Sequence, residues 1–151
     1  MVKLFFFNAL LILCLTTKAQ KNTTDSVKAA VNLMFKAMRT SDTILLQSTF
    51  TTDALLQTFS RTPLGKIVVV TETVPNFMKN VGAFKPGAIE ERIVFETVKI
   101  DRNMAMAWTP YKLYIDGKFI QCGVNSFQLV RLDGLWKIQY IIDTKSKTGC
   151  N

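Results

Sequence analysis

Two Asp-Gly dipeptides constrain the fold of this chain more than any other feature. Asp116-Gly117 and Asp133-Gly134 each stand between long stretches rich in β-branched and aromatic residues. Asp-Gly is a strong signal for a two-residue hairpin turn, because both residues tolerate the positive φ angles that such a turn requires. The sequence therefore predicts an antiparallel meander, with strands over about 89–101, 104–115, 118–132 and 135–144.

The first half of the chain predicts helices. Apolar residues recur at helical spacing at five positions: Val27, Val31, Met34, Phe35 and Met38. Such a stripe is typical of an amphipathic helix that packs on a core. Shorter helices are expected after Ser41-Asp42 and around Pro75, with strands near 54–59 and 67–71. Helices followed by a long meander indicate an α+β fold, in which N-terminal helices pack on a strongly curved antiparallel sheet.

Residues 1–19 predict a secretory signal peptide. Lys3 precedes an apolar run over 4–15, and residues 17–19 place small side chains before Gln20. The run is shorter than the roughly 20 residues that a membrane-spanning helix needs. We therefore expect cleavage near Ala19-Gln20, export to the periplasm or beyond the cell, and no stable membrane anchor. The rest, residues 20–151, is expected to be a single domain, and a buried N-terminal helix is the alternative for the leader.

Cleavage would remove Cys14 and leave Cys122 and Cys150. An even pair of cysteines in an exported protein indicates a disulfide bond. Such a bond would close a loop of 29 residues, worth roughly 3–4 kcal/mol in the chain-entropy treatment. The alternative is a buried thiol at Cys122 and a free one at Cys150.

Composition excludes several kinds of site. The 151 residues include no histidine, which removes the Ser-His-Asp triad, the Cys-His dyad and the common zinc motifs. No glycine-rich phosphate loop is present, so the sequence implies no metal and no cofactor. The formal charge is +8, or +6 without Lys3 and Lys18. Its lysines and arginines are spread along the chain rather than clustered among aromatic residues, which argues against nucleic-acid binding.

The two hairpins also predict which residues share a face of the sheet. With the Asp-Gly dipeptides as loops, Trp108 lies opposite Asn125 and Met106 lies opposite Phe127. Because side chains alternate between faces, six residues are expected to line a ligand pocket: Met106, Trp108, Asn125, Phe127, Tyr140 and Ile142. A small planar or apolar ligand would stack on Trp108 and Tyr140. Asn125 would either orient this ligand or be a buried amide satisfied by hydrogen bonds.

The opposite face of the predicted sheet is mixed in polarity. It includes Tyr111, Ile141 and two alanines among polar residues. That pattern fits either a half-solvated surface or the interface of a homodimer.

Two carboxylates are candidates for catalysis. In the predicted register Asp143 falls on the outer face, although a β-bulge would turn it inward, and Glu96 lies on a strand whose register is not fixed. Glu90-Glu91-Arg92 is interpreted as a solvated strand end. No pair of carboxylates is held at a catalytic spacing, so the sequence favours binding over an enzyme. A cavity carboxylate with a raised pKa would favour an enzyme instead.

The C-terminal half resembles a known family. The motifs that carry the resemblance are Ala107-Trp108-Thr109-Pro110-Tyr111, Tyr114-Ile115-Asp116-Gly117-Lys118-Phe119, Cys122-Gly123-Val124, Phe127-Gln128-Leu129 and Trp136-Lys137-Ile138. Together they resemble the lumazine-binding family of the nuclear transport factor 2-like superfamily, over roughly residues 25–150. The resemblance implies a cone-shaped fold whose curved sheet encloses a pocket closed by the N-terminal helices. The superfamily includes ketosteroid isomerase, polyketide cyclases and dehydratases, and the family name implies a pterin-like ligand.

These observations predict an exported domain that binds a small molecule in an apolar and aromatic pocket. An isomerase or dehydratase that uses a buried carboxylate is one alternative. The other is a structural or partner-binding subunit without catalysis.

Overall fold

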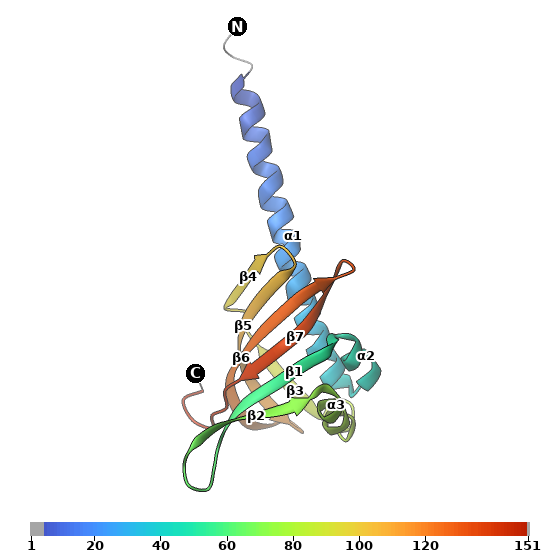
Figure 1. The fold of residues 1–151 in the computed structure, drawn as a ribbon, viewed down its shortest axis with the longest axis vertical. Helices are drawn as coiled ribbons and strands as arrows, with labels where there is room; N and C mark the ends of the chain where they lie inside the picture. The colour runs from blue at the N-terminus through green and yellow to red at the C-terminus, as the bar shows by residue number, and fades with distance from the viewer. Residues whose placement is uncertain (1–4, 151) are drawn as a thin grey trace.

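The computed structural model describes the backbone of residues 5–150 and the side chains of residues 23–150. The predicted signal peptide therefore lies outside the residues whose side chains are described. In order along the chain, the elements are α1 (Phe5–Thr40), α2 (Thr43–Ser48), β1 (Phe50–Arg61), β2 (Ile67–Thr73), α3 (Val74–Gly82), β3 (Ile89–Ile93), β4 (Thr97–Asp101), β5 (Met104–Ile115), β6 (Lys118–Leu132) and β7 (Leu135–Asp143) (Figure 1).

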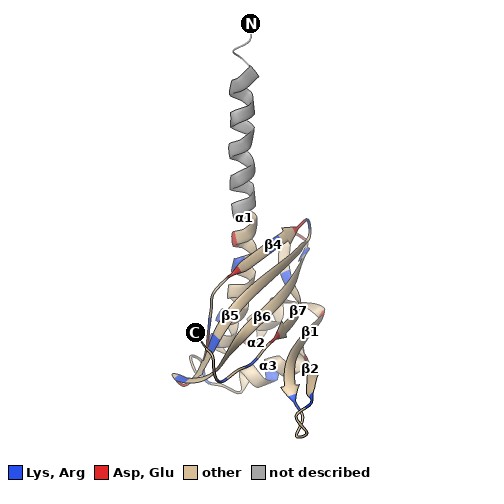
Figure 2. Cartoon of the chain, turned by 90° about the vertical axis from the view of Figure 1, so that its left-hand side faces the viewer, with Lys and Arg blue, Asp and Glu red and all other residues tan. Residues whose placement is uncertain are grey.

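These strands form one curved sheet with the helices on one side of it, as the two perpendicular views show (Figure 1 and Figure 2). The strand order is β2-β1-β7-β6-β5-β3, and β4 pairs with β5 beside β3. The predicted α+β fold is confirmed, but the sheet is mixed rather than purely antiparallel, because β1 runs parallel to β7. These two strands are joined through α3 and the whole meander, so no hairpin forces them to run in opposite directions.

Both predicted Asp-Gly turns are confirmed. All four turn residues have positive φ angles: 49° at Asp116, 74° at Gly117, 49° at Asp133 and 82° at Gly134. This is the geometry of type I′ turns, whose twist matches that of the flanking strands.

The predicted pairing of β5 with β6 is wrong beyond a β-bulge. One extra residue, Ile120, is inserted on β6 near the turn. Trp108 therefore lies opposite Ser126, and Thr109 lies opposite Asn125. An inserted residue moves the side chains that follow it to the other face of the sheet. Trp108 and Met106, which share one face of β5, therefore lie on the outer face and not on the face that packs on the helices.

A second bulge changes the faces of β7. Between the pairs Gln128–Tyr140 and Leu129–Ile138, Gln139 is the extra residue. Tyr140 and Ile142 consequently lie on the outer face, while Ile141 and Asp143 lie on the inner one, opposite Phe127 and Asn125. Tyr111 and the two alanines of β5 also lie inside, so the predicted composition of the outer face is wrong as well.

The predicted strand over 89–101 is two strands, β3 and β4, which both pair with β5. The interruption between β3 and β4 lies opposite Pro110. The carbonyl oxygen of Pro110 accepts a hydrogen bond from Val94 N at 3.0 Å, but proline has no N–H to donate in return.

The apolar stripe of α1 packs on the inner face of the sheet. Val27 and Val31 are fully buried, in one core cluster with Phe127 and Ile138. The start of α2 is capped by Asp42, whose Oδ1 accepts from Leu45 N at 2.9 Å, as carboxylates commonly do at helix N-termini.

The predicted disulfide between Cys122 and Cys150 is present. Among the described residues, no helix has the length and apolar character needed to cross a membrane.

Candidate functional site

A cavity of about 300 Å³, partly open to solvent, lies between the inner face of the sheet and the helices. Most of its wall is apolar. Its apolar side chains come from α1, α3, the segment after α3 and five strands: Met34, Phe35, Met38, Phe77, Val81, Phe84, Leu56, Ile89, Leu113, Ile115, Phe127 and Ile141. A cavity of this size and polarity is typical of a small-molecule site.

One end of the cavity is polar, and its first component is a pair formed by Glu91 and Asn125. Asn125 Nδ2 donates a hydrogen bond to Glu91 Oε1 at 2.8 Å. Glu91 lies on β3, on the same face of the strand as Ile89 and Ile93, and this face packs against α1. Among the hydrogen bonds of the described residues, Glu91 Oε2 has no partner, so this oxygen is available to a ligand.

The second component is a network around Tyr111 and Asp143. The Tyr111 hydroxyl lies 3.1 Å from Asp143 Oδ2 and 3.0 Å from the carbonyl oxygen of Thr144, so its proton is shared between two acceptors. Gln121 Nε2 donates to the same hydroxyl oxygen at 3.1 Å. Tyr111, Gln121 and Asp143 all line the cavity.

The electrostatics of this end favour protonated groups. Burial raises the pKa of Glu91 to about 7, and the neighbouring Asp143 adds to the rise, whereas Asn125 and Lys145 oppose it. Burial also raises the pKa of Asp143 against the opposing effects of Thr58, Lys145 and Tyr111. The pKa of Tyr111 is raised by burial and by both carboxylates. Near pH 7 Glu91 therefore exists in both protonation states, as a group that transfers protons must.

The structure brings together some of the predicted site residues and not others. Asn125, Phe127 and Asp143 line the cavity, Asp143 through the bulge in β7. Four predicted pocket residues do not line it, because the two bulges place them on the outer face: Met106, Trp108, Tyr140 and Ile142. Glu96 is exposed in the break between β3 and β4 and does not line the cavity either.

Two central residues were missed by the sequence interpretation. The sequence predicts a solvated strand end for Glu91 and a place on the outer face for Tyr111. The alternation Ile89-Glu90-Glu91-Arg92-Ile93 carried a usable signal for Glu91, since it puts this residue on the same face as two isoleucines. Tyr111 had no such signal, because its face depends on the bulge.

Solved structures with the same arrangement come from several bacteria. A nuclear transport factor 2-like protein of unknown function from Shewanella baltica matches with a TM-score of 0.67 and 13% identity, over 84% of this chain and 96% of that one. One from Methylobacillus flagellatus matches with a TM-score of 0.63 and 15% identity, over 83% and 93%. This chain has the nuclear transport factor 2-like fold.

Another match is a protein of this fold from Streptomyces avermitilis that is provisionally named a dehydratase. It has a TM-score of 0.62 and 14% identity, over 84% of this chain and 98% of that one. No protein-family model matches the sequence. No curated protein matches it either. Identities this low establish a shared fold and leave the chemistry to be argued from the cavity.

Proposed function

We propose that this protein binds a small, mostly apolar molecule in the cavity, with a polar group of that molecule at the Glu91–Asn125 pair. The observation that carries the proposal is an apolar cavity of about 300 Å³ that ends in a few converging polar side chains. Phe127 would contribute an apolar wall and Glu91 Oε2 a hydrogen-bonding site. The originally predicted stacking on Trp108 and Tyr140 is not part of this proposal, since neither residue lines the cavity.

Fluorescence titration with 2-naphthol tests the proposal, because this planar bicyclic molecule carries one hydroxyl group for the polar end. The matched ligand 2-methylnaphthalene has nearly the same shape and no hydroxyl, so it should bind more weakly. Leu113→Trp fills the cavity and should weaken the binding of 2-naphthol at least about tenfold. Leu64→Trp is the control, since Leu64 is 96% exposed and far from the cavity wall. Equal binding by both variants would refute the proposal.

A complementary experiment is mass spectrometry of any small molecule that co-purifies with the native protein. The resemblance to the lumazine-binding family makes a pterin-like molecule one planar ligand to look for. A native ligand displaced by 2-naphthol would support binding in the same cavity.

Acid–base catalysis, as in an isomerase or dehydratase, is the second candidate function. The specific observation that favours it is Glu91, whose pKa of about 7 lets it accept and return a proton near neutral pH. Asn125 would hold Glu91 through Oε1, and the Tyr111 hydroxyl would turn from Asp143 and the Thr144 carbonyl to donate its hydrogen bond to a developing oxyanion. The provisionally named dehydratase of the same fold supports this candidate.

Deuterium exchange at the acidic carbon next to the carbonyl of 2-tetralone tests that candidate by NMR in deuterated water. The exchange rate should rise with pH up to about 7 and then level off, as Glu91 becomes a base. Glu91→Gln should abolish the catalysed exchange, while Glu90→Gln should leave it unchanged because Glu90 does not line this cavity. Exchange that persists in Glu91→Gln would exclude Glu91 as the base.

We also propose that the protein is exported after cleavage near Ala19-Gln20. The Cys122–Cys150 disulfide supports export, because such bonds persist mainly in oxidising compartments. Comparing the mass of the protein from the periplasm or medium with that of the full chain tests the proposal.

A further inference from the structure

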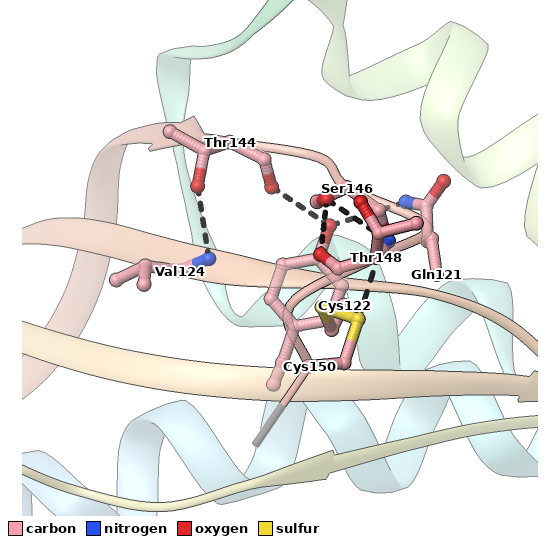
Figure 3. The surroundings of a disulfide bond; sticks show 8 residues. Gln121, Cys122, Val124, Thr144, Ser146, Thr148 and Cys150 are labelled. Carbon is pink, nitrogen blue, oxygen red and sulfur yellow. Dashed lines mark hydrogen bonds between the residues drawn. A yellow bond between two sulfur atoms is a disulfide. The ribbon is translucent and has the colours of Figure 1, made fainter.

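The last residues of the chain lie against the polar end of the cavity. After β7, residues 144–146 continue alongside β6 in the register of the β6–β7 pair, and the chain then bends so that Cys150 reaches Cys122; we call residues 144–150 the C-terminal strap (Figure 3). Lys145 on the strap lines the cavity, together with Asp143 at the end of β7. The strap therefore contributes directly to the wall of the proposed binding site.

The first part of the strap is hydrogen-bonded to β6. Thr144 and Val124 exchange two bonds: Thr144 N donates to Val124 O, and Val124 N donates to Thr144 Oγ1, each at 3.1 Å. Ser146 and Cys122 exchange two backbone bonds, of 2.8 and 2.9 Å (Figure 3). The strap approaches β6 so closely at Gly123 that only glycine fits there, since a Cβ at this position would lie 1.8 Å from the carbonyl oxygen of Thr144.

The strap also orders the polar end of the cavity. The carbonyl oxygen of Thr144 is one of the two acceptors of the Tyr111 hydroxyl. Lys145 places a positive charge near both carboxylates, which lowers their pKa values against the effect of burial. Displacing the strap would remove a partner of Tyr111 and the cation that offsets Glu91 and Asp143.

The Cys122–Cys150 disulfide is what holds the far end of the strap. Residues 144–149 are all exposed, and exposed terminal segments with few packed contacts open easily. Among the polar contacts of the described residues, those beyond Ser146 stay within the strap itself: Ser146 with Thr148, and Cys150 Sγ with Ser146 O at 3.9 Å. The covalent link joins the strap's end to Cys122, a buried residue of β6.

We propose that the C-terminal strap is a wall of the binding cavity and that the Cys122–Cys150 disulfide keeps this wall in place, so that the ligand affinity of the cavity depends on the bond. This inference rests on the proposed binding function and adds how that function is controlled. When the bond is intact, the cavity has its complete polar end. A dithiol reductant would give the two sulfurs two electrons and two protons, producing two thiols while the dithiol becomes a disulfide. The freed strap then spends part of its time away from β6, and apparent affinity falls with the fraction of molecules whose wall is formed.

The test compares the wild-type protein with the double variant Cys122→Ala/Cys150→Ala and with Lys145→Gln. Lys147→Gln is the matched control, because Lys147 is a cation on the same strap that does not line the cavity. Two quantities are measured: the Kd of 2-naphthol, and the pH midpoint of the Glu91 side-chain carboxyl, followed by ¹³C NMR and assigned with Glu91→Gln.

We expect the double variant to raise the Kd of 2-naphthol about fivefold or more and to raise the Glu91 midpoint, with unchanged circular dichroism. Treating the wild-type protein with dithiothreitol should reproduce both changes. Lys145→Gln should raise the Glu91 midpoint with the disulfide intact, and Lys147→Gln should change neither quantity. If the double variant does not fold, the wild-type protein treated with dithiothreitol still tests the dependence on the bond, and the two lysine variants test the strap as part of the cavity wall.

A folded double variant with the wild-type Kd and the wild-type Glu91 midpoint would overturn the inference. Equal effects of Lys145→Gln and Lys147→Gln would overturn it too, since they would show only a general effect of charge. If wild-type protein does not bind 2-naphthol, the proposed binding of this ligand class fails separately. The Glu91 midpoint then tests the strap by itself, and an unchanged midpoint in the double variant refutes it.

Discussion

Replacing Glu91 by Gln should stabilise this protein at alkaline pH and leave its stability nearly unchanged in acid. Gln is neutral at every pH and has nearly the same shape as protonated Glu, and its Oε1 can still accept the hydrogen bond from Asn125. The substitution therefore removes the charge and little else.

The magnitude follows from the pKa of Glu91, which burial raises from 4.5 to about 7. Each tenfold change in proton affinity is worth about 1.4 kcal/mol, so the difference between the pKa of Glu91 in the folded protein and in the unfolded chain amounts to about 3 kcal/mol of stability. Between pH 4.5 and 7 the folded protein retains a proton that the unfolded chain has released. The free energy of unfolding therefore falls as the pH rises through this range, and the loss is complete above about pH 7. Against a typical total of about 5–15 kcal/mol, this is a substantial share.

Urea denaturation at pH 4 and at pH 8.5 measures the effect. We expect the free energy of unfolding of Glu91→Gln to exceed that of the wild type by up to about 3 kcal/mol at pH 8.5 and to match it at pH 4. Glu90→Gln is the control with the opposite sign. In the wild-type protein the hydrogen bond from Arg92 lowers the pKa of Glu90. The Glu90 carboxylate therefore stabilises the folded protein at pH values above the pKa that Glu90 has in the unfolded chain, and this contribution is lost in acid. Parallel pH profiles for Glu91→Gln and the wild type would refute the burial of a titrating carboxylate.

Three further predictions concern the core, the strap and the outer face. Phe127→Ala should lower the free energy of unfolding by about 3–5 kcal/mol in urea denaturation, because Phe127 is fully buried in the centre of the sheet; a loss below about 1 kcal/mol would contradict its place in the core. Gly123→Ala should destabilise by about 1–3 kcal/mol and speed hydrogen exchange at Ser146 N, since the new Cβ collides with the strap; unchanged exchange would show that the approach is looser than described. We also propose that the outer face, where Met104 and Trp108 are 56% and 41% exposed, binds a second copy of the chain. In sedimentation velocity Trp108→Lys should then shift a dimer towards monomer, and a wild-type monomer at high concentration would exclude this interface.

Local signals in the sequence predicted most of the elements correctly. The Asp-Gly dipeptides identified both type I′ turns because few residues tolerate two successive positive φ angles. The spacing from Val27 to Met38 identified the buried stripe of α1 because helical periodicity is a local property. The pairing of Cys122 with Cys150 followed from their number once the leader was set aside.

The candidate site was predicted less well, and two inserted residues explain most of the difference. Ile120 and Gln139 are ordinary strand residues in the sequence, yet each forms a bulge that reverses the faces beyond it. Bulges accommodate the twist and curvature that a sheet needs in order to wrap around helices, so their positions depend on the whole assembly. For this reason Trp108 and Tyr140 moved out of the expected pocket while Asp143 moved into it.

The sequence by itself determined the order of elements, the turns, the disulfide and the absence of histidine chemistry, because these depend on residue identity and on neighbours along the chain. The tertiary structure alone decided which side chains meet in the cavity. Glu91, Asn125 and Asp143 come from three different strands, and burial in the packed molecule raises the proton affinity of the two carboxylates. Burial and register are properties of the packed molecule, so the chemistry of the cavity appears only once the sheet has closed around its core.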